Sequence, residues 1–261
     1  MFQVIINSNS TWYRLSEDSR FSVINVDGLA PPTVAVNTST NAGDGAFFNS
    51  AYVQPRNIVI TIVLNGDIET SRKALYDIFP IKKSLEFVFV NKNRGVQITG
   101  YVESINIPLF SQRQQAQVSI ICPSAWFRDY TIRTQNFTRV DNSYLTKTVE
   151  NSGDIDMGVG IFGNFAGSAA GFTLTYVTTG ETFSVSYVFQ NGDTMYINTK
   201  QGELTAWVRR SGVVTSLLPY ISNTSRWIKL QRGTNELRIT MSTGLANTSA
   251  RVTWAALFGG V

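Results

Sequence analysis

Short runs of alternating apolar and polar residues, separated by turns rich in Gly and Asn, dominate the second half of the chain. Beyond residue 165 these runs lie at 172–178, 182–189, 194–198, 203–209, 225–230, 236–241 and 251–258. Alternation places the apolar side chains of a strand on one face and the polar ones on the other. Several short strands with regular turns and no helix predict a β-sandwich or jelly roll.

The first half predicts a second β-rich domain that contains one short helix. Strand patterns lie at 2–6, 20–26, 57–64, 85–90, 96–102 and 115–121. The helix would begin after Asp67, which can cap it, and end before Pro80, which cannot continue it. Leu75, Ile78 and Phe79 fall on one face of that helix. The fold class expected for the whole chain is therefore mainly β.

Two segments between the predicted strands differ from the rest. Residues 37–50 are poor in apolar side chains until Phe47 and Phe48, which predicts a long irregular loop of the kind that often carries function. Residues 91–95 separate two strong strand patterns with a polar, basic turn that ends in Gly95. They predict a long hairpin whose tip consists of Asn91, Lys92, Asn93 and Arg94.

The length of 261 residues is sufficient for two domains, and the pattern of strand and turn signals changes near residue 130. We expect an N-terminal domain at 1–130 and a C-terminal β-sandwich at 131–261. A chain of this size can bury enough surface to fold without a disulfide or a structural metal. Its single cysteine, Cys122, follows two isoleucines and is interpreted as a small buried hydrophobe.

Net charge and hydropathy limit the classes of partner, such as nucleic acid or a membrane, that the chain can bind. The net charge is +4, and the basic residues form only short clusters. A nucleic-acid-binding protein usually carries a longer basic stripe, so specific DNA binding is disfavoured. No apolar run approaches the ~18 residues of a membrane helix, and the N-terminus lacks a signal-peptide pattern. We expect a soluble protein made in a cytoplasm, without a membrane partner.

The residue types also argue against an enzyme. Histidine is absent, which removes Ser-His-Asp and Cys-His catalysis and most zinc sites. The carboxylate pairs that remain are Glu17–Asp18, Asp67 with Glu69, and Asp154 with Asp156. Their contexts are typical of an exposed turn, a helix cap and a solvated loop. The sequence predicts no catalytic site, no metal site and no cofactor.

Two binding functions stay open at this stage. Trp207 and Trp227 could stack on the apolar face of a sugar, although both lie in strand patterns where a core position is more usual. A monomeric carbohydrate-binding module that recognises host cell-wall polysaccharide is therefore one hypothesis. The other is an assembly protein, because exposed strand edges and protruding hairpins invite pairing with another chain.

Several motifs, in their order and spacing, resemble the siphophage tail-component family over nearly the whole chain. In the first half the motifs are 26–32, 43–48, 56–61, Gly66–Asp67, the helix with Arg72 and Leu75, 100–104 and 120–127. In the second half they are 192–199 and 230–237. The type of member that the chain is most similar to is the distal tail protein of siphophage baseplates.

That resemblance implies a structural role at the tail tip of a phage virion or of a phage-tail-like particle. The N-terminal domain would be a belt that closes a homo-hexameric ring around a channel, through which DNA passes without specific binding. The C-terminal domain would be a galectin-like sandwich that can hold receptor-binding proteins. The ring would join the tail-tube protein to a tail-associated lysin or tail fibre. A tail-tube or connector ring protein is an alternative within the same class.

We assign the hairpin tip, Asn91 to Arg94, as an axial or tube-facing contact, because its polar side chains are unsuited to a buried core. Changing Lys92 and Arg94 to Glu would then abolish tail assembly and leave the ring intact.

Overall fold

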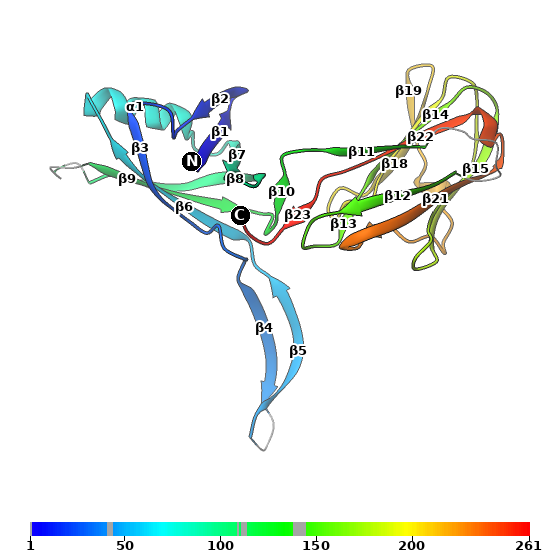
Figure 1. Ribbon diagram of the computed structural model, residues 1–261, viewed down its shortest axis with the longest axis horizontal. Helices are drawn as coiled ribbons and strands as arrows, with labels where there is room; N and C mark the ends of the chain where they lie inside the picture. The colour runs from blue at the N-terminus through cyan, green and yellow to red at the C-terminus, as the bar shows by residue number, and fades with distance from the viewer. Residues whose placement is uncertain (1, 41–43, 109, 111–113, 138–144) are drawn as a thin grey trace. The chain divides into compact units, whose positions relative to one another are not determined.

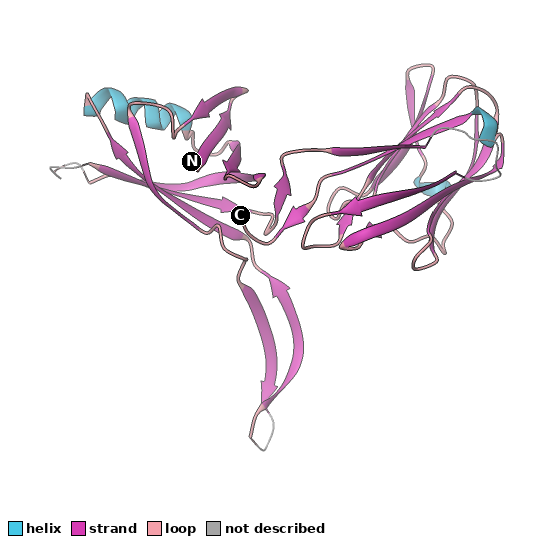
Figure 2. Cartoon of the chain, in the orientation of Figure 1, coloured by secondary structure: helices cyan, strands magenta, loops and turns pink. Residues whose placement is uncertain are grey.

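The computed structural model describes residues 2–40, 44–108, 110, 114–137 and 145–261 (Figure 1). The chain forms two compact units, of which the first comprises residues 1–130 and 258–261 and the second residues 131–257. Strands make up most of both units, and the described residues contain one α-helix and two short 3-10 turns (Figure 2). The predicted mainly β fold class is confirmed.

The first unit is built on one antiparallel sheet with the strand order β2-β1-β7-β8-β9-β6-β3, and β10 pairs with β8. The strands are β1 (Gln3–Ser8), β2 (Thr11–Arg14), β3 (Phe21–Asp27), β6 (Arg56–Leu64), β7 (Ser84–Val90), β8 (Gly95–Asn106), β9 (Gln115–Cys122) and β10 (Phe127–Asp129). In the central strand β6, Ile58, Ile60 and Ile62 are fully buried. β-Branched side chains suit this position because they pack well on a pleated surface.

The helix α1 (Ile68–Ile78) forms where the sequence predicts it. The Asp67 side chain accepts a hydrogen bond from the backbone N–H of Thr70 at 3.3 Å, which satisfies one of the free donors of the first turn. Leu75 and Ile78 are buried on one face. This packing stabilises a helix that would be too short to persist alone in water.

The prediction of an irregular loop at residues 37–50 is wrong. Apart from residues 41–43, which lie outside the described residues, this region forms the hairpin of β4 (Val34–Thr40) and β5 (Ala46–Val53). Among the described residues the two strands pair only with each other, and they extend away from the main sheet (Figure 1). We call the described part of this hairpin, residues 34–40 and 44–53, the arm. Both of its faces are largely exposed, so its sequence lacks the alternation that marks a half-buried strand.

The second unit is a β-sandwich. Its larger sheet has the order β11-β22-β14-β17-β18-β19, its smaller sheet the order β12-β21-β15-β16, and β13 and β20 form a separate pair. The elements are β11 (Arg133–Phe137), β12 (Leu145–Asn151), β13 (Met157–Gly158), β14 (Gly160–Phe165), β15 (Ala169–Tyr176), β16 (Glu181–Phe189), β17 (Thr194–Asn198), β18 (Thr205–Arg210), β19 (Val213–Ser216), η1 (Leu218–Tyr220), β20 (Lys229–Leu230), β21 (Gly233–Thr243), η2 (Leu245–Asn247) and β22 (Thr248–Trp254). The short β23 (Leu257–Phe258) ends the strand series.

Inward side chains from both sheets form one core cluster. Within it the rings of Phe165 and Phe189 stack with their centroids 3.9 Å apart. The strand at 194–198 matches the sequence prediction, whereas the one predicted at 225–230 is reduced to Lys229–Leu230. The sequence patterns also missed β11 to β14 and β19.

Candidate functional site: the arm and its base

The arm exposes large apolar side chains that a hairpin in water would normally bury. Phe47 is 61% exposed and Phe48 is 67% exposed, and Val34, Val36 and Tyr52 are each about half exposed. The arm is on the order of 25 Å long, since a strand rises about 3.4 Å per residue. A two-stranded hairpin is marginally stable alone, and its outer edges carry unpaired backbone groups. The arm therefore has the properties of a docking element.

The base of the arm is held by one buried arginine. Arg56 opens β6 directly after the arm and is only 4% exposed. Its Nη1 donates to the carbonyl oxygens of Gly28 at 2.5 Å and Ala30 at 2.6 Å, on the segment that enters the arm. Its Nε and Nη2 donate to Ala125 O at 3.0 and 2.9 Å, and Nη2 also reaches Gly259 O at 2.6 Å. One guanidinium thus joins three separate segments of the first unit.

No carboxylate is among these partners of Arg56. Its charge is met by carbonyl dipoles and by the ring of Phe127, whose centroid lies 4.3 Å from Cζ. Burial lowers the pKa of Arg56, because desolvation disfavours the charged form. Sequence reasoning missed this role, since an arginine at the start of a strand pattern is usually an exposed residue.

Gly28 fixes the path of the chain into the arm. Its φ is +84°, and a Cβ there would lie 2.1 Å from the carbonyl oxygen of Asn57. Only glycine can adopt this conformation at such a close approach without a backbone shift.

The predicted hairpin tip divides into two parts. The Asn91 side-chain oxygen accepts from the backbone N–H groups of Asn93 and Arg94 at 2.9 and 2.8 Å, which closes the turn. Lys92 and Asn93 are exposed. Arg94 instead turns back onto its own unit, with Cζ 3.9 Å from the ring centroid of Phe258. The outward-facing part of the tip is therefore Lys92 and Asn93.

The two tryptophans selected from the sequence have separate surroundings in the sandwich. Trp207 is half-buried in β18, and its ring centroid is 5.5 Å from that of Tyr196 in β17. Trp227 packs against the core, 4.8 Å from the ring of Phe183 in β16. They have different ring partners, so the contacts give no support for one shared sugar platform.

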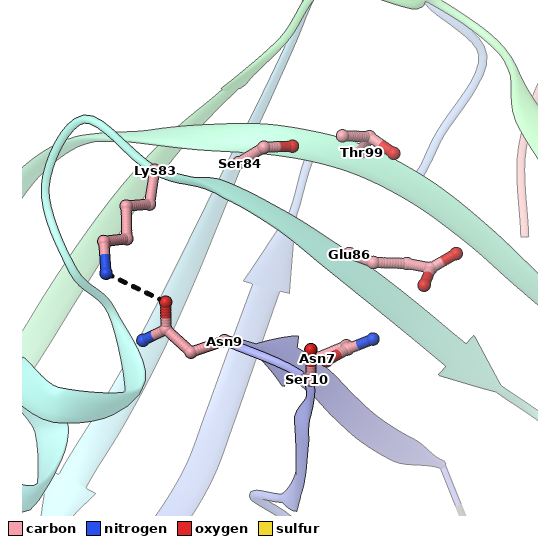
Figure 3. A pocket seen from close by; sticks show the side chains of 7 residues that line it. All are labelled: Asn7, Asn9, Ser10, Lys83, Ser84, Glu86 and Thr99. Carbon is pink, nitrogen blue, oxygen red and sulfur yellow. Dashed lines mark hydrogen bonds between the residues drawn. The ribbon is translucent and has the colours of Figure 1, made fainter.

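An open polar depression of about 370 Å³ lies beside β1, β7 and β8 in the first unit (Figure 3). Its lining residues are Asn7, Asn9, Ser10, Lys83, Ser84, Glu86 and Thr99. The Lys83 amine donates to Asn9 Oδ1 at 3.0 Å, as the dashed line shows. This arrangement pairs no nucleophile with a base, and we assign it no chemistry.

The described residues give no support for a metal site, a membrane-spanning helix or a reactive thiol. Within 2–40, 44–108, 110, 114–137 and 145–261, no group of three or more His, Cys, Asp or Glu side chains could hold a metal ion. In the same ranges, no helix is long and apolar enough to cross a membrane. Cys122 is fully buried, and burial raises the pKa of its thiol to about 12.

Comparison with known proteins gives a family match in the second unit. Residues 152–256, most of the second unit, match the family model described as the siphovirus-type tail component, C-terminal domain. The resemblance to siphophage tail components is thus confirmed for this part of the chain. Among curated proteins no sequence matches.

Solved structures extend the likeness to the whole chain. The crystal structure of SPP1 Dit, described as a paradigm of the hub adsorption apparatus in phages that infect Gram-positive bacteria, aligns with a TM-score of 0.75 at 15% identity, covering 99% of each chain. A chain of the phage P2 baseplate in its activated conformation with Ca aligns with a TM-score of 0.51 at 10% identity, covering 98% of this chain and 99% of that one. At these identities the likeness shows a shared fold. Residues 152–256 thus match a siphovirus-type tail component domain, and the whole chain shares the fold of SPP1 Dit.

Proposed function

We propose that this chain is a structural, non-enzymatic distal tail protein, whose first units close a hexameric ring at the tip of a siphophage-type tail. The arm is the observation that carries the proposal. It presents Phe47, Phe48 and Tyr52 to solvent and leaves its strand edges unpaired. Exposed apolar patches of this kind mark interaction sites.

The partner of the arm would be the next copy of the same chain. Each copy carries one arm and one main sheet, so an arm that docks on a neighbour makes a head-to-tail contact. Such contacts generate a ring when the rotation between copies closes. Backbone pairing along the arm edges would supply affinity without a preformed pocket, as in other strand-addition interfaces. The rigid base at Arg56 would set the angle at which the arm leaves.

The remaining partners follow from the resemblance to distal tail proteins. The ring would join the tail-tube protein on one side to a tail-associated lysin or tail fibre on the other. The second unit, as a galectin-like sandwich, would hold a receptor-binding protein. DNA would pass through the channel without specific binding, consistent with a net charge of only +4. The protein would be synthesised in the host cytoplasm.

Light scattering on the size-exclusion peak tests the ring. The expected mass is six times that of the 28.9 kDa chain, about 173 kDa, with annular particles in negative stain. A Phe47→Asp, Phe48→Asp double variant should be monomeric. The matched control is Val213→Asp, Val214→Asp, which changes two exposed apolar side chains of β19 in the same way and should keep the ring.

A wild-type chain that stays monomeric even with the tail-tube protein present would contradict the proposal. A ring that survives in the arm variant would instead place the interface elsewhere. Filaments in place of closed rings would favour a tail-tube protein.

The hairpin tip is tested separately from the ring. Lys92→Glu should block attachment to the tail tube while the purified ring keeps its mass, because Lys92 is exposed and its side chain takes no part in the hydrogen bonds that close the turn. Arg94→Glu would be ambiguous, since Arg94 contacts Phe258 in its own unit. Normal tails assembled from the Lys92→Glu protein would refute the assignment of the tip.

A further inference from the structure

The larger sheet of the sandwich carries a row of aromatic rings on the face opposite the core. Strand register places Trp207, Tyr196, Phe162 and Arg251 side by side across β18, β17, β14 and β22. Their sequence neighbours, such as Ile161, Ile197 and Val252, point into the core. Alternation therefore turns the row outward.

The row is continuous. Ring centroids are 5.5 Å apart between Trp207 and Tyr196, and 4.7 Å apart between Tyr196 and Phe162. The guanidinium of Arg251 extends the row beyond Phe162, with Cζ 4.7 Å from the ring centroid. Four adjacent strands span about 14 Å, since neighbouring strands lie ~4.8 Å apart. A row of this length can contact several units of a polymer.

A second row, made of polar side chains, runs beside the aromatic one. Register places Arg209, Thr194, Asn164 and Ser249 next to one another on the same four strands. Asn164 and Ser249 also line an open depression of about 300 Å³, together with Asn247 and others. Ring faces beside amides and hydroxyls at the edge of a depression are typical of a carbohydrate site.

The charges on this face are arranged for an anion. Arg209 and Arg251 are exposed, and in the described part of the chain neither guanidinium forms an ion pair with a carboxylate. Arg209 lies over the ring of Trp207, with Cζ 5.5 Å from the centroid. Asp193, next to the polar row, is neutralised by Arg210, whose Nη2 lies 2.6 Å from Oδ2.

An acidic group, Glu203, lies at the opposite end of these strands, where it accepts a hydrogen bond from Asn198 at 3.1 Å. The negative charge of Glu203 thus lies at the Asn198 end of β17. The positive charge of Arg209 lies at the Thr194 end, because Arg209 is opposite Thr194 in the strand register. An acidic ligand would place its charged groups at the Arg209 end.

We infer that this face binds an acidic polysaccharide, a sugar polymer that carries carboxylate or phosphate groups. Sugar rings would stack on Trp207 and Tyr196, hydroxyls would meet the polar row, and the acidic groups would meet Arg209 and Arg251. The second unit would then contact the cell-surface glycan itself. This function is independent of the ring, and it is measured on the purified chain whatever its oligomeric state.

The test is biolayer interferometry with the full chain against immobilised polygalacturonate, a phosphorylated mannan, neutral dextran and a single-stranded oligonucleotide. We expect binding to at least one of the two acidic polysaccharides, weaker at high salt because exposed charges are screened. Loss of one charge-assisted contact should weaken it about tenfold. Arg209→Ala and Arg251→Ala should each do so, and both are exposed residues whose loss leaves the core intact.

Trp207→Ala should weaken binding by a similar factor, with circular dichroism confirming that the sandwich remains folded. The matched control is Arg232→Ala, which removes an exposed arginine in the turn before β21 and should leave affinity unchanged. No binding of either acidic polysaccharide would overturn the inference. Equal losses in the Arg232→Ala protein would do the same, as would tighter binding of the oligonucleotide that depends on Trp207.

Discussion

Replacing Arg56 by Met should loosen the base of the arm more than any single change in the arm itself. Methionine keeps an unbranched chain of comparable reach but removes every donor that Arg56 offers. Four carbonyl groups would lose the guanidinium as a hydrogen-bond donor, namely those of Gly28, Ala30, Ala125 and Gly259. Each buried carbonyl left without a partner costs about 1–3 kcal/mol.

The net loss is smaller than the sum of these four terms. Removing the guanidinium also removes the cost of its burial, and water can reach the carbonyls that are only partly buried. Breaking a buried charged contact in proteins costs about 3–5 kcal/mol, and we expect the Arg56→Met protein to fall in that range. Arg56→Lys should lose less, about 1–3 kcal/mol, because the ammonium keeps the charge but lacks the planar fork that reaches several carbonyls at once.

Hydrogen exchange measured by mass spectrometry is the direct assay, with urea unfolding as the measure of stability. Protection should fall around residues 28–33 and 257–261, while peptides from β14 to β18 in the second unit keep wild-type rates. The arm should then lose its fixed direction, and the fraction of ring on size exclusion should drop. A protein with Met at this position that unfolds within about 0.5 kcal/mol of the wild type, with unchanged exchange at these segments, would refute the reasoning.

Three further predictions concern single groups. Arg210 lowers the pKa of Asp193 by hydrogen bonding, so stability from this carboxylate is present above its unfolded pKa near 3.8 and lost as pH falls through the lower folded value. Asp193→Asn should therefore lower Tm at pH 7, and the gap to the wild type should narrow as the pH falls below about 3.8, whereas a constant gap would contradict this. Cys122, with a pKa of about 12, should resist Ellman's reagent at pH 8 until urea unfolds the chain, and rapid labelling of the folded protein would contradict its burial. Gly28→Ala should destabilise the first unit by at least ~1 kcal/mol in the same urea assay, and an unchanged midpoint would refute the close approach at this glycine.

Much of the fold follows from local pattern alone. The helix between Asp67 and Pro80, the hairpin around Asn91 to Gly95 and the strand at 194–198 all appear where the sequence predicts them. Each is specified by signals within a few residues, namely a cap, a turn or an alternation with a period of two. Composition likewise narrows the chemistry, because a chain without histidine lacks the usual general base and the commonest metal ligand.

The arm and its base depend on tertiary structure. Prediction of strands relies on one face being buried, and the arm buries neither, so Val34 to Val53 had no pattern to find. The role of Arg56 depends on Gly28, Ala125 and Gly259, which are far apart in the sequence and meet only in the folded unit. No local sequence pattern predicts that Arg56 contacts these distant segments.

The aromatic row shows the same division. The place of Trp207 in a strand can be read from its neighbours, which alternate between apolar and polar. The presence of Tyr196, Phe162 and Arg251 beside it comes from the pairing of β18, β17, β14 and β22. Period-two alternation sets which side chains share a face within one strand, whereas register between strands is set by long-range contacts. The residues are thus visible in the sequence, and their common surface arises from the register.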